Sequence, residues 1–176
     1  KPSVEEFRAK VERHCKNLNS DGRPKLHLNG IEIAQHAIDV EAIFGPAHAF
    51  TPWTAIYSAH DSLKSCYGDL ASKVTFAELG LSADTDYADR ISELHPLTFI
   101  TSSDAHGPKP NRIAREFVRF ETKGNSASEI IMALRLSAAL RNAILKGRSF
   151  KQEMGNCFLK VYSGSQPSTA EAAPTG

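Results

Sequence analysis

The apolar run Leu97-Thr98-Phe99-Ile100 is followed directly by Thr101-Ser102-Ser103-Asp104-Ala105-His106 and then by Gly107-Pro108-Lys109-Pro110. This order predicts a short buried strand that opens into a loop. Asp104 and His106 are two residues apart, and extended backbone directs such side chains to the same side. A carboxylate and an imidazole so placed either hold one metal ion or do acid–base chemistry. A polar loop that only caps the next element is the plain structural alternative.

The rest of the chain alternates helical and extended patterns, which predicts an α/β layer fold with a largely parallel sheet or barrel. We expect one domain over residues 1–150, then an irregular segment and disordered tail over residues 151–176. Expected helices are Val4–Asn17, Gly30–Glu41 with Asn29 as its cap, Asp61–Tyr67, and Ser126–Leu140 with a Ser126–Glu129 capping box. Expected strands are Ala42–Gly45, Val74–Gly80, Leu97–Ile100 and Glu116–Glu121, and Ala49–Tyr57 is expected to be an ordered loop.

Composition and charge restrict the class of protein. The 176 residues have a formal net charge of +1, so nucleic-acid binding would need a local basic patch rather than a global field. The three cysteines form no C-x-x-C pair, which argues against a disulfide framework or zinc ribbon and favours the cytoplasm. No apolar run approaches the length of a membrane span, so we expect no membrane partner.

Potential metal ligands follow three of the expected strands. His48 comes after Ala42–Gly45, Glu78 ends the apolar part of Val74–Gly80, and Asp104 and His106 follow Leu97–Ile100. If the strands are parallel, their carboxyl ends meet at one edge, where α/β proteins place their active sites. These donors suit divalent ions such as zinc, manganese or magnesium, which activate water and phosphoryl groups. Taken one at a time, each residue also has a structural explanation. His48 could be a loop histidine, and Glu78 could cap a helix or form an ion pair with an arginine.

Two further groups flank these positions. Lys109, Arg112 and Arg115 form a local basic cluster, in which Arg112 and Arg115 either hold phosphates or pair with Glu116. The aromatic residues of the loop that follows His48 are either core residues or surfaces on which a nucleobase stacks. These aromatic residues are Phe50, Trp53 and Tyr57.

Several blocks, in one order, resemble the polymerase-and-histidinol-phosphatase (PHP) superfamily, and within it the endonuclease Q branch. The resemblance spans roughly Leu28–Phe120. Its blocks are Gly45-Pro46-Ala47-His48-Ala49-Phe50-Thr51-Pro52-Trp53-Thr54, Asp61-Ser62-Leu63 with Cys66-Tyr67-Gly68, Glu78-Leu79-Gly80-Leu81-Ser82-Ala83-Asp84-Thr85-Asp86, Ser103-Asp104-Ala105-His106, and Arg112 with Arg115-Glu116-Phe117.

The resemblance implies a distorted, seven-stranded β/α barrel with a metal cluster at its carboxyl mouth. It implies an endonuclease that nicks DNA beside deaminated bases such as uracil or hypoxanthine, and at abasic sites. His48, Asp104 and His106 correspond to metal ligands of the superfamily, and Glu78 is carried over as a fourth. Phe50 and Trp53 would contact an extruded base.

The chain also departs from the superfamily. The H-x-H strand that opens the superfamily's barrel does not occur anywhere in this sequence, and neither does the branch's cysteine-rich zinc module. We therefore expect an incomplete PHP-type barrel that begins in mid-barrel, and self-association through exposed sheet edges. Two alternatives stay open: a PHP-family phosphatase of small molecules, and a non-catalytic remnant that binds DNA or a partner protein.

Overall fold

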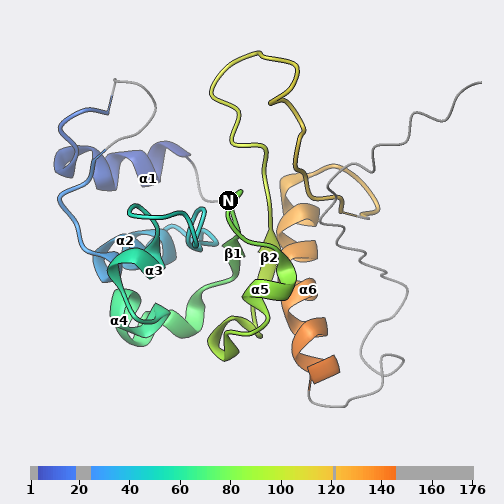
Figure 1. The fold of residues 1–176 in the computed structure, drawn as a ribbon. Coiled ribbons are helices and arrows are strands. Elements are labelled where there is room, and N and C mark those ends of the chain that lie inside the picture. Colours follow the sequence, from blue (N-terminus) through green and yellow to red (C-terminus); the bar gives the residue numbers. More distant parts are fainter. Residues whose placement is uncertain (1–3, 19–24, 121, 146–176) are drawn as a thin grey trace, which may run out of the picture.

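The computed structural model describes residues 4–18, 25–120 and 122–145. In chain order its elements are α1 (Val4–Val11), η1 (Glu12–His14), α2 (Gly30–Asp39), α3 (Ile56–Ala59), α4 (Leu63–Tyr67), η2 (Gly68–Lys73), β1 (Phe76–Glu78), α5 (Thr85–Ala88), η3 (Ser92–Leu94), β2 (Thr98–Ile100) and α6 (Ala127–Leu145). Helices α1 to α4 lie on one side of the two strands and α6 lies on the other (Figure 1). The segment after β2 extends away from the sheet before the chain returns to α6 (Figure 1).

The helices begin where the sequence supplies caps. The Asn29 side chain accepts a hydrogen bond from the Glu32 amide at 2.9 Å, and Glu32 accepts one from the Asn29 amide at 2.8 Å. These two bonds satisfy amides that the first turn of α2 would leave unpaired. Ser126 and Glu129 exchange the same pair of bonds at the start of α6, so both predicted caps are confirmed.

Strands β1 and β2 form a parallel pair, as predicted. Phe76 lies opposite Thr98, Ala77 opposite Phe99 and Glu78 opposite Ile100. Thr98 is fully buried, and its hydroxyl donates to the carbonyl of Leu134 on α6 at 2.6 Å. This bond satisfies a polar group that burial would otherwise penalise, and it joins the sheet to α6.

The hydrophobic core lies around this pair of strands. Its buried members come from the strands and from the helices and turns around them, so the sheet is the centre of packing. They are Leu63, Val74, Ala77, Leu79, Ala88, Leu94, Leu97 and Phe99.

The strand predicted at Ala42–Gly45 is wrong as a regular strand, although its backbone does run beside β1. The Phe44 carbonyl accepts from the Thr75 amide at 3.0 Å, and the Pro46 carbonyl accepts from the Glu78 amide at 3.0 Å. Pro46 has no amide hydrogen to donate in return. The ladder is therefore one-sided at this point, and the segment is a strand-like loop that lies along β1.

The strand predicted at Glu116–Glu121 is also wrong over its described residues 116–120, which adopt no helix or strand. Alternation of apolar and polar residues makes a strand only where a partner strand is available. Neither β1 nor β2 pairs with this segment.

Two expectations extend beyond what the structure describes. The two strands are the whole sheet within the described ranges, so the seven-stranded barrel stays a prediction. The expected tail over residues 151–176 lies outside the described residues. Across the described part of the chain, no helix is both long and apolar enough to cross a membrane.

Gly45 provides a test of the contact along β1. A Cβ atom at this position would lie 2.0 Å from the Phe76 carbonyl oxygen, which is fixed in the strand. We expect Gly45→Ala to lower the free energy of unfolding by about 1–3 kcal/mol, measured by urea denaturation. Gly107→Ala is the matched control, because nothing lies within 4 Å of its added Cβ. Equal stability of the two variants would contradict the close approach.

Candidate active site

The carboxyl ends of β1 and β2 meet at one edge of the sheet. The Leu79 amide donates to the Ile100 carbonyl at 2.9 Å, so the two chains remain paired as they leave the strands. Glu78 is the last residue of β1, and the Asp104–His106 loop begins just after β2. The predicted convergence of these two strand ends is confirmed.

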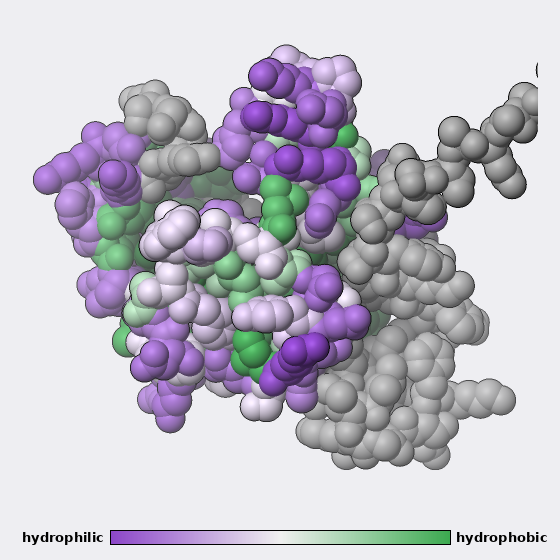
Figure 2. Space-filling view, viewed as in Figure 1, coloured by the Kyte–Doolittle hydropathy of each residue, from purple (hydrophilic) through white to green (hydrophobic). Residues whose placement is uncertain are grey.

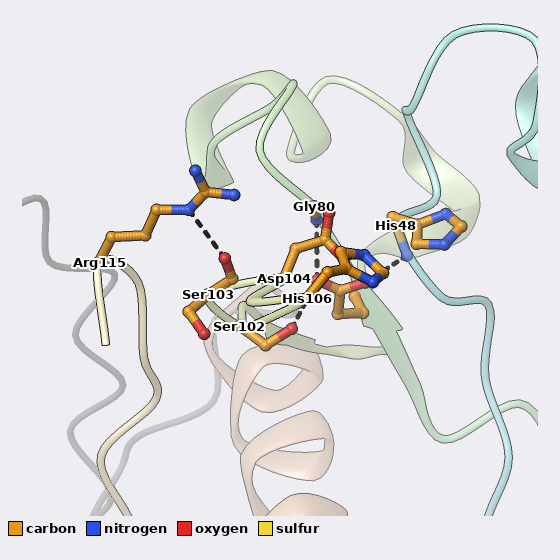
Figure 3. A network of polar contacts seen from close by, with 8 residues as sticks. His48, Gly80, Ser102, Ser103, Asp104, His106 and Arg115 are labelled. Atoms are coloured by element: carbon orange, nitrogen blue, oxygen red, sulfur yellow. Dashed lines mark hydrogen bonds and ion pairs between the residues drawn. The ribbon is translucent and has the colours of Figure 1, made fainter. Parts of the chain in front are cut away.

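Glu78 is the centre of a hydrogen-bond network at this edge. Its Oε2 accepts a short hydrogen bond from the His48 amide. Its Oε1 accepts from the Gly80 amide at 3.2 Å and from the Ser102 hydroxyl at 3.2 Å. Figure 3 shows these partners gathered from three separate loops. One carboxylate therefore ties together the loop before β1, the turn after it and the loop after β2.

The loop that carries His48 lies tightly against the turn after β1. His48 has a φ of 33° and Gly80 a φ of 71°, both in the left-handed region that favours glycine. A Cβ at Gly80 would lie 2.8 Å from the His48 Cβ, so only glycine fits there. The His48 backbone is held by these contacts, while its residue is exposed to solvent.

Asp104 and His106 form a pair at the open end of the loop. His106 Nε2 lies 3.0 Å from Asp104 Oδ1, within hydrogen-bond distance. The Asp104 side chain is 52% exposed and the His106 side chain 50% exposed, so solvent reaches both. Asp104 has a φ of 48°, a left-handed conformation that Asp tolerates better than most residues. The two side chains therefore lie close together, although the backbone at Asp104 is left-handed and not extended as the sequence predicted, and the His48 ring lies apart from them (Figure 3).

Arg115 supports this loop from the side away from His48. Its Nε donates to the Ser103 carbonyl at 2.8 Å, one residue before Asp104 (Figure 3). Close by, the Thr101 hydroxyl donates a short hydrogen bond to Glu116. Arg112 is exposed on the same extended segment. Arg115 therefore uses one of its hydrogen-bond donors, Nε, to position the loop.

The aromatic residues predicted to meet a base have two different environments. Phe50 is half-buried: its ring stacks on Tyr57 at 5.3 Å and meets the edge of Tyr87 at 5.2 Å. These rings, with Ser58 and Ser82, line a pocket of about 210 Å³. Trp53 is not among the lining residues, and it is 92% exposed.

Glu93 holds this aromatic group in place, a role that sequence reasoning missed. It accepts from the Tyr57 hydroxyl at 2.9 Å and from the Leu63 amide at 3.0 Å. Burial, together with the neighbouring Glu93 carboxylate, raises the pKa of the Tyr57 hydroxyl well above its ordinary value. The hydroxyl therefore keeps its proton and remains a donor.

Ser102 and Gly80 were also missed as functional partners. The available signals were a hydroxyl directly after a strand and a glycine two residues beyond a strand-end carboxylate. Both signals are common in loops and become specific only once β1 and β2 are paired.

Some of the residues at this edge are of types that bind divalent ions. Imidazole nitrogen and carboxylate oxygen are ligands that zinc and manganese accept. The 3.0 Å between Asp104 and His106 is also about the separation of two neighbouring ligands whose bonds to one ion are about 2.1 Å. Glu78 already accepts three hydrogen bonds. Within the described ranges, no three His, Cys, Asp or Glu side chains are grouped to hold one ion. The pair fits two positions of a metal shell without completing it.

The mixed α/β fold, with its candidate site at paired strand ends, is similar to that of solved Endonuclease Q structures. Two solved structures of Endonuclease Q are similar to the chain. The lesion-specific endonuclease PfuEndoQ from Pyrococcus furiosus matches 77% of this chain with a TM-score of 0.71 and 47% identity. Endonuclease Q in complex with a 27-mer duplex substrate, with an abasic lesion at the active site, matches 75% of it with a TM-score of 0.71 and 49% identity.

Two curated proteins are also similar. The uncharacterized protein MJ0043 of Methanocaldococcus jannaschii is 50% identical over 80 residues, which is 45% of this chain and 10% of that protein. The uncharacterized protein YqxK of Bacillus subtilis is 30% identical over 134 residues, which is 75% of this chain and 33% of that protein. No family model matches the chain. The chain spans 34% and 33% of the two Endonuclease Q chains, so it corresponds to about a third of their length.

Substitution of Glu78 tests the network at the strand ends. In Glu78→Gln an amide group replaces one acceptor oxygen, so at least one of the three donors loses its partner. We expect the free energy of unfolding to fall by about 2 kcal/mol, measured by urea denaturation. Glu41→Gln, at an exposed position, should match the wild type. Identical denaturation midpoints for all three proteins would refute a structural role for Glu78.

Proposed function

We propose that this chain supplies part of the catalytic region of a metal-dependent endonuclease that nicks DNA at lesions. The proposal includes deaminated bases such as uracil and hypoxanthine, and abasic sites, as the lesions. The observation that carries it is an Endonuclease Q fold at 47% identity with an exposed carboxylate–imidazole pair at the strand ends. The seven-stranded PHP-type barrel and its metal cluster belong to the same proposal.

Asp104 and His106 are the proposed metal ligands, with His48 and Glu78 as further ligands predicted from the sequence. A divalent ion such as zinc, manganese or magnesium would supply Lewis-acid activation of the phosphodiester. The alternative role for His106, in place of metal binding, is that of a general acid that would protonate the departing oxygen, with Asp104 holding the imidazole ring through Nε2.

The segment after β2 is the proposed contact for the DNA backbone. Arg112 is exposed, and Arg115 has two terminal nitrogens beyond the Nε that binds Ser103. Guanidinium groups match the geometry of phosphate oxygens, and developing charge on the phosphate is stabilised by such donors. Phe50 and its pocket are the proposed site for an extruded base, and Trp53, which the sequence also predicted to contact that base, does not line the pocket.

Asp104→Asn tests the chemistry. The amide keeps the shape of the side chain but not its charge, so we expect nicking of a uracil-containing duplex to fall by about 10²–10⁴-fold. Asp86→Asn, at an exposed carboxylate of α5, is the matched control and should cut normally. Undiminished cleavage by Asp104→Asn, with the fold intact by circular dichroism, would remove Asp104 from the catalytic site.

Metal content separates an enzyme from a non-catalytic binding protein. We expect elemental analysis of the purified chain to find about one or more divalent ions per chain. The double substitution His48→Ala/Asp104→Ala should abolish this content. A metal-free wild type would favour the alternative of a remnant that binds DNA or a protein without cutting. Metal binding combined with hydrolysis of a phosphomonoester, but not DNA, would favour the PHP-family phosphatase.

A further inference from the structure

Trp53 has the most exposed large apolar side chain in the part of the chain that the structure describes. Its residue is 92% exposed, whereas the next most exposed, Val4, is 80% exposed and lies at the start of α1. An indole left in water forgoes one of the largest gains available from burial. The sequence has one tryptophan, and it stands on the loop that also supplies His48.

The backbone at Trp53 is also in a conformation that is energetically unfavourable. Its φ is 64°, in the left-handed region where a side chain other than that of glycine is disfavoured. Glycine at this position would relieve the strain and remove the exposed indole together. Strained conformations of this kind concentrate at sites where proteins bind or react.

The turn that carries Trp53 is held firmly at its base. The Thr51 amide donates to the His48 carbonyl at 2.9 Å, and the Ala55 amide donates to the Thr51 carbonyl at 3.2 Å. Ala49 donates to the Glu78 carbonyl at 2.7 Å, which joins the turn to β1. The backbone that carries the indole is therefore already fixed by hydrogen bonds, so binding would cost little conformational entropy in this turn.

The turn is near the strand-end site but separate from the aromatic pocket. Trp53 is five residues from His48, so their Cα atoms are at most about 18 Å apart, the length of about five base steps in DNA. The pocket of about 210 Å³ is lined by Phe50, Tyr57, Ser58, Ser82 and Tyr87. Trp53 thus cannot form a wall of the pocket that would take an extruded base.

We propose that Trp53 is a wedge that stacks on a nucleobase of the duplex beside the vacated position. The indole has the flat face that stacks on any base, and exposed aromatic or apolar side chains open duplex steps in this way. The inference rests on the proposed function in taking DNA as the partner. It adds that the two aromatic residues have different roles: the Phe50 pocket takes the extruded base, and Trp53 stacks on a base that remains in the duplex.

Intrinsic fluorescence tests this directly, because the single tryptophan makes the emission a report on Trp53 alone. The full chain is titrated with a duplex that carries an abasic site with 2-aminopurine opposite it. Binding is followed independently by the anisotropy of a dye at the far end of the DNA. We expect tryptophan emission to be quenched, and 2-aminopurine emission to change, over the same concentration range as the anisotropy.

Variants complete the test. Trp53→Gly should bind the duplex about tenfold more weakly, since a base stacked on an aromatic ring contributes roughly this much. The same variant should unfold at a higher temperature, because glycine relieves the backbone strain. Trp53→Phe should keep most of the affinity. Met132→Ala, which shortens a side chain 57% exposed on α6, is the control and should bind as the wild type does.

Each contrary result has a distinct meaning. Full binding by anisotropy without any change in tryptophan emission would overturn the wedge and leave DNA as the partner. Wild-type affinity of Trp53→Gly would do the same. A lower unfolding temperature of Trp53→Gly would overturn the wedge by showing that Trp53 is a packing residue. Absence of any anisotropy change with the wild type would overturn the proposed function, and the wedge with it.

Discussion

The carboxylate of Glu78 is the interaction on which the rest of the site depends. It stands at the end of β1 and accepts hydrogen bonds from His48, Gly80 and Ser102. Hydrogen bonds to a charged acceptor are stronger than those between neutral groups, and they fix the donors in direction as well as distance. Three loops that share no local sequence are thereby placed around one edge of a two-stranded sheet. The loops themselves are free to carry polar and strained residues because their ends are fixed.

Two projecting features flank the Asp104–His106 pair as a result. On one side, Arg115 joins the extended segment after β2 to the Ser103 carbonyl. On the other, the His48 loop continues into the turn that carries Trp53. The surface of the extended segment is predominantly hydrophilic in the space-filling view, in keeping with its lysine and arginine residues (Figure 2). A chain with a net charge of only +1 thus concentrates Lys109, Arg112 and Arg115 on one exposed segment.

Most of what was predicted correctly came from short-range patterns. The capping boxes at Asn29 and Ser126 depend on residues three positions apart. The errors came from segments whose structure needs a distant partner. Ala42–Gly45 has the apolar character of a strand, but Pro46 leaves one side of its ladder without a donor. Residues 116–120 alternate, yet neither described strand lies beside them.

The sequence by itself determined helices α2 and α6 with their caps, and the two strands, because these depend on patterns that repeat within about one turn of helix or one step of strand. Only the tertiary structure decided that Glu78 organises the site, since its partners His48 and Ser102 are 30 and 24 residues away. It also decided that Phe50 is packed between tyrosines while Trp53 is exposed, although the two are three residues apart on one loop. The burial of a residue depends on which distant segments of the chain pack against it, and the residues next to it in the sequence do not determine this.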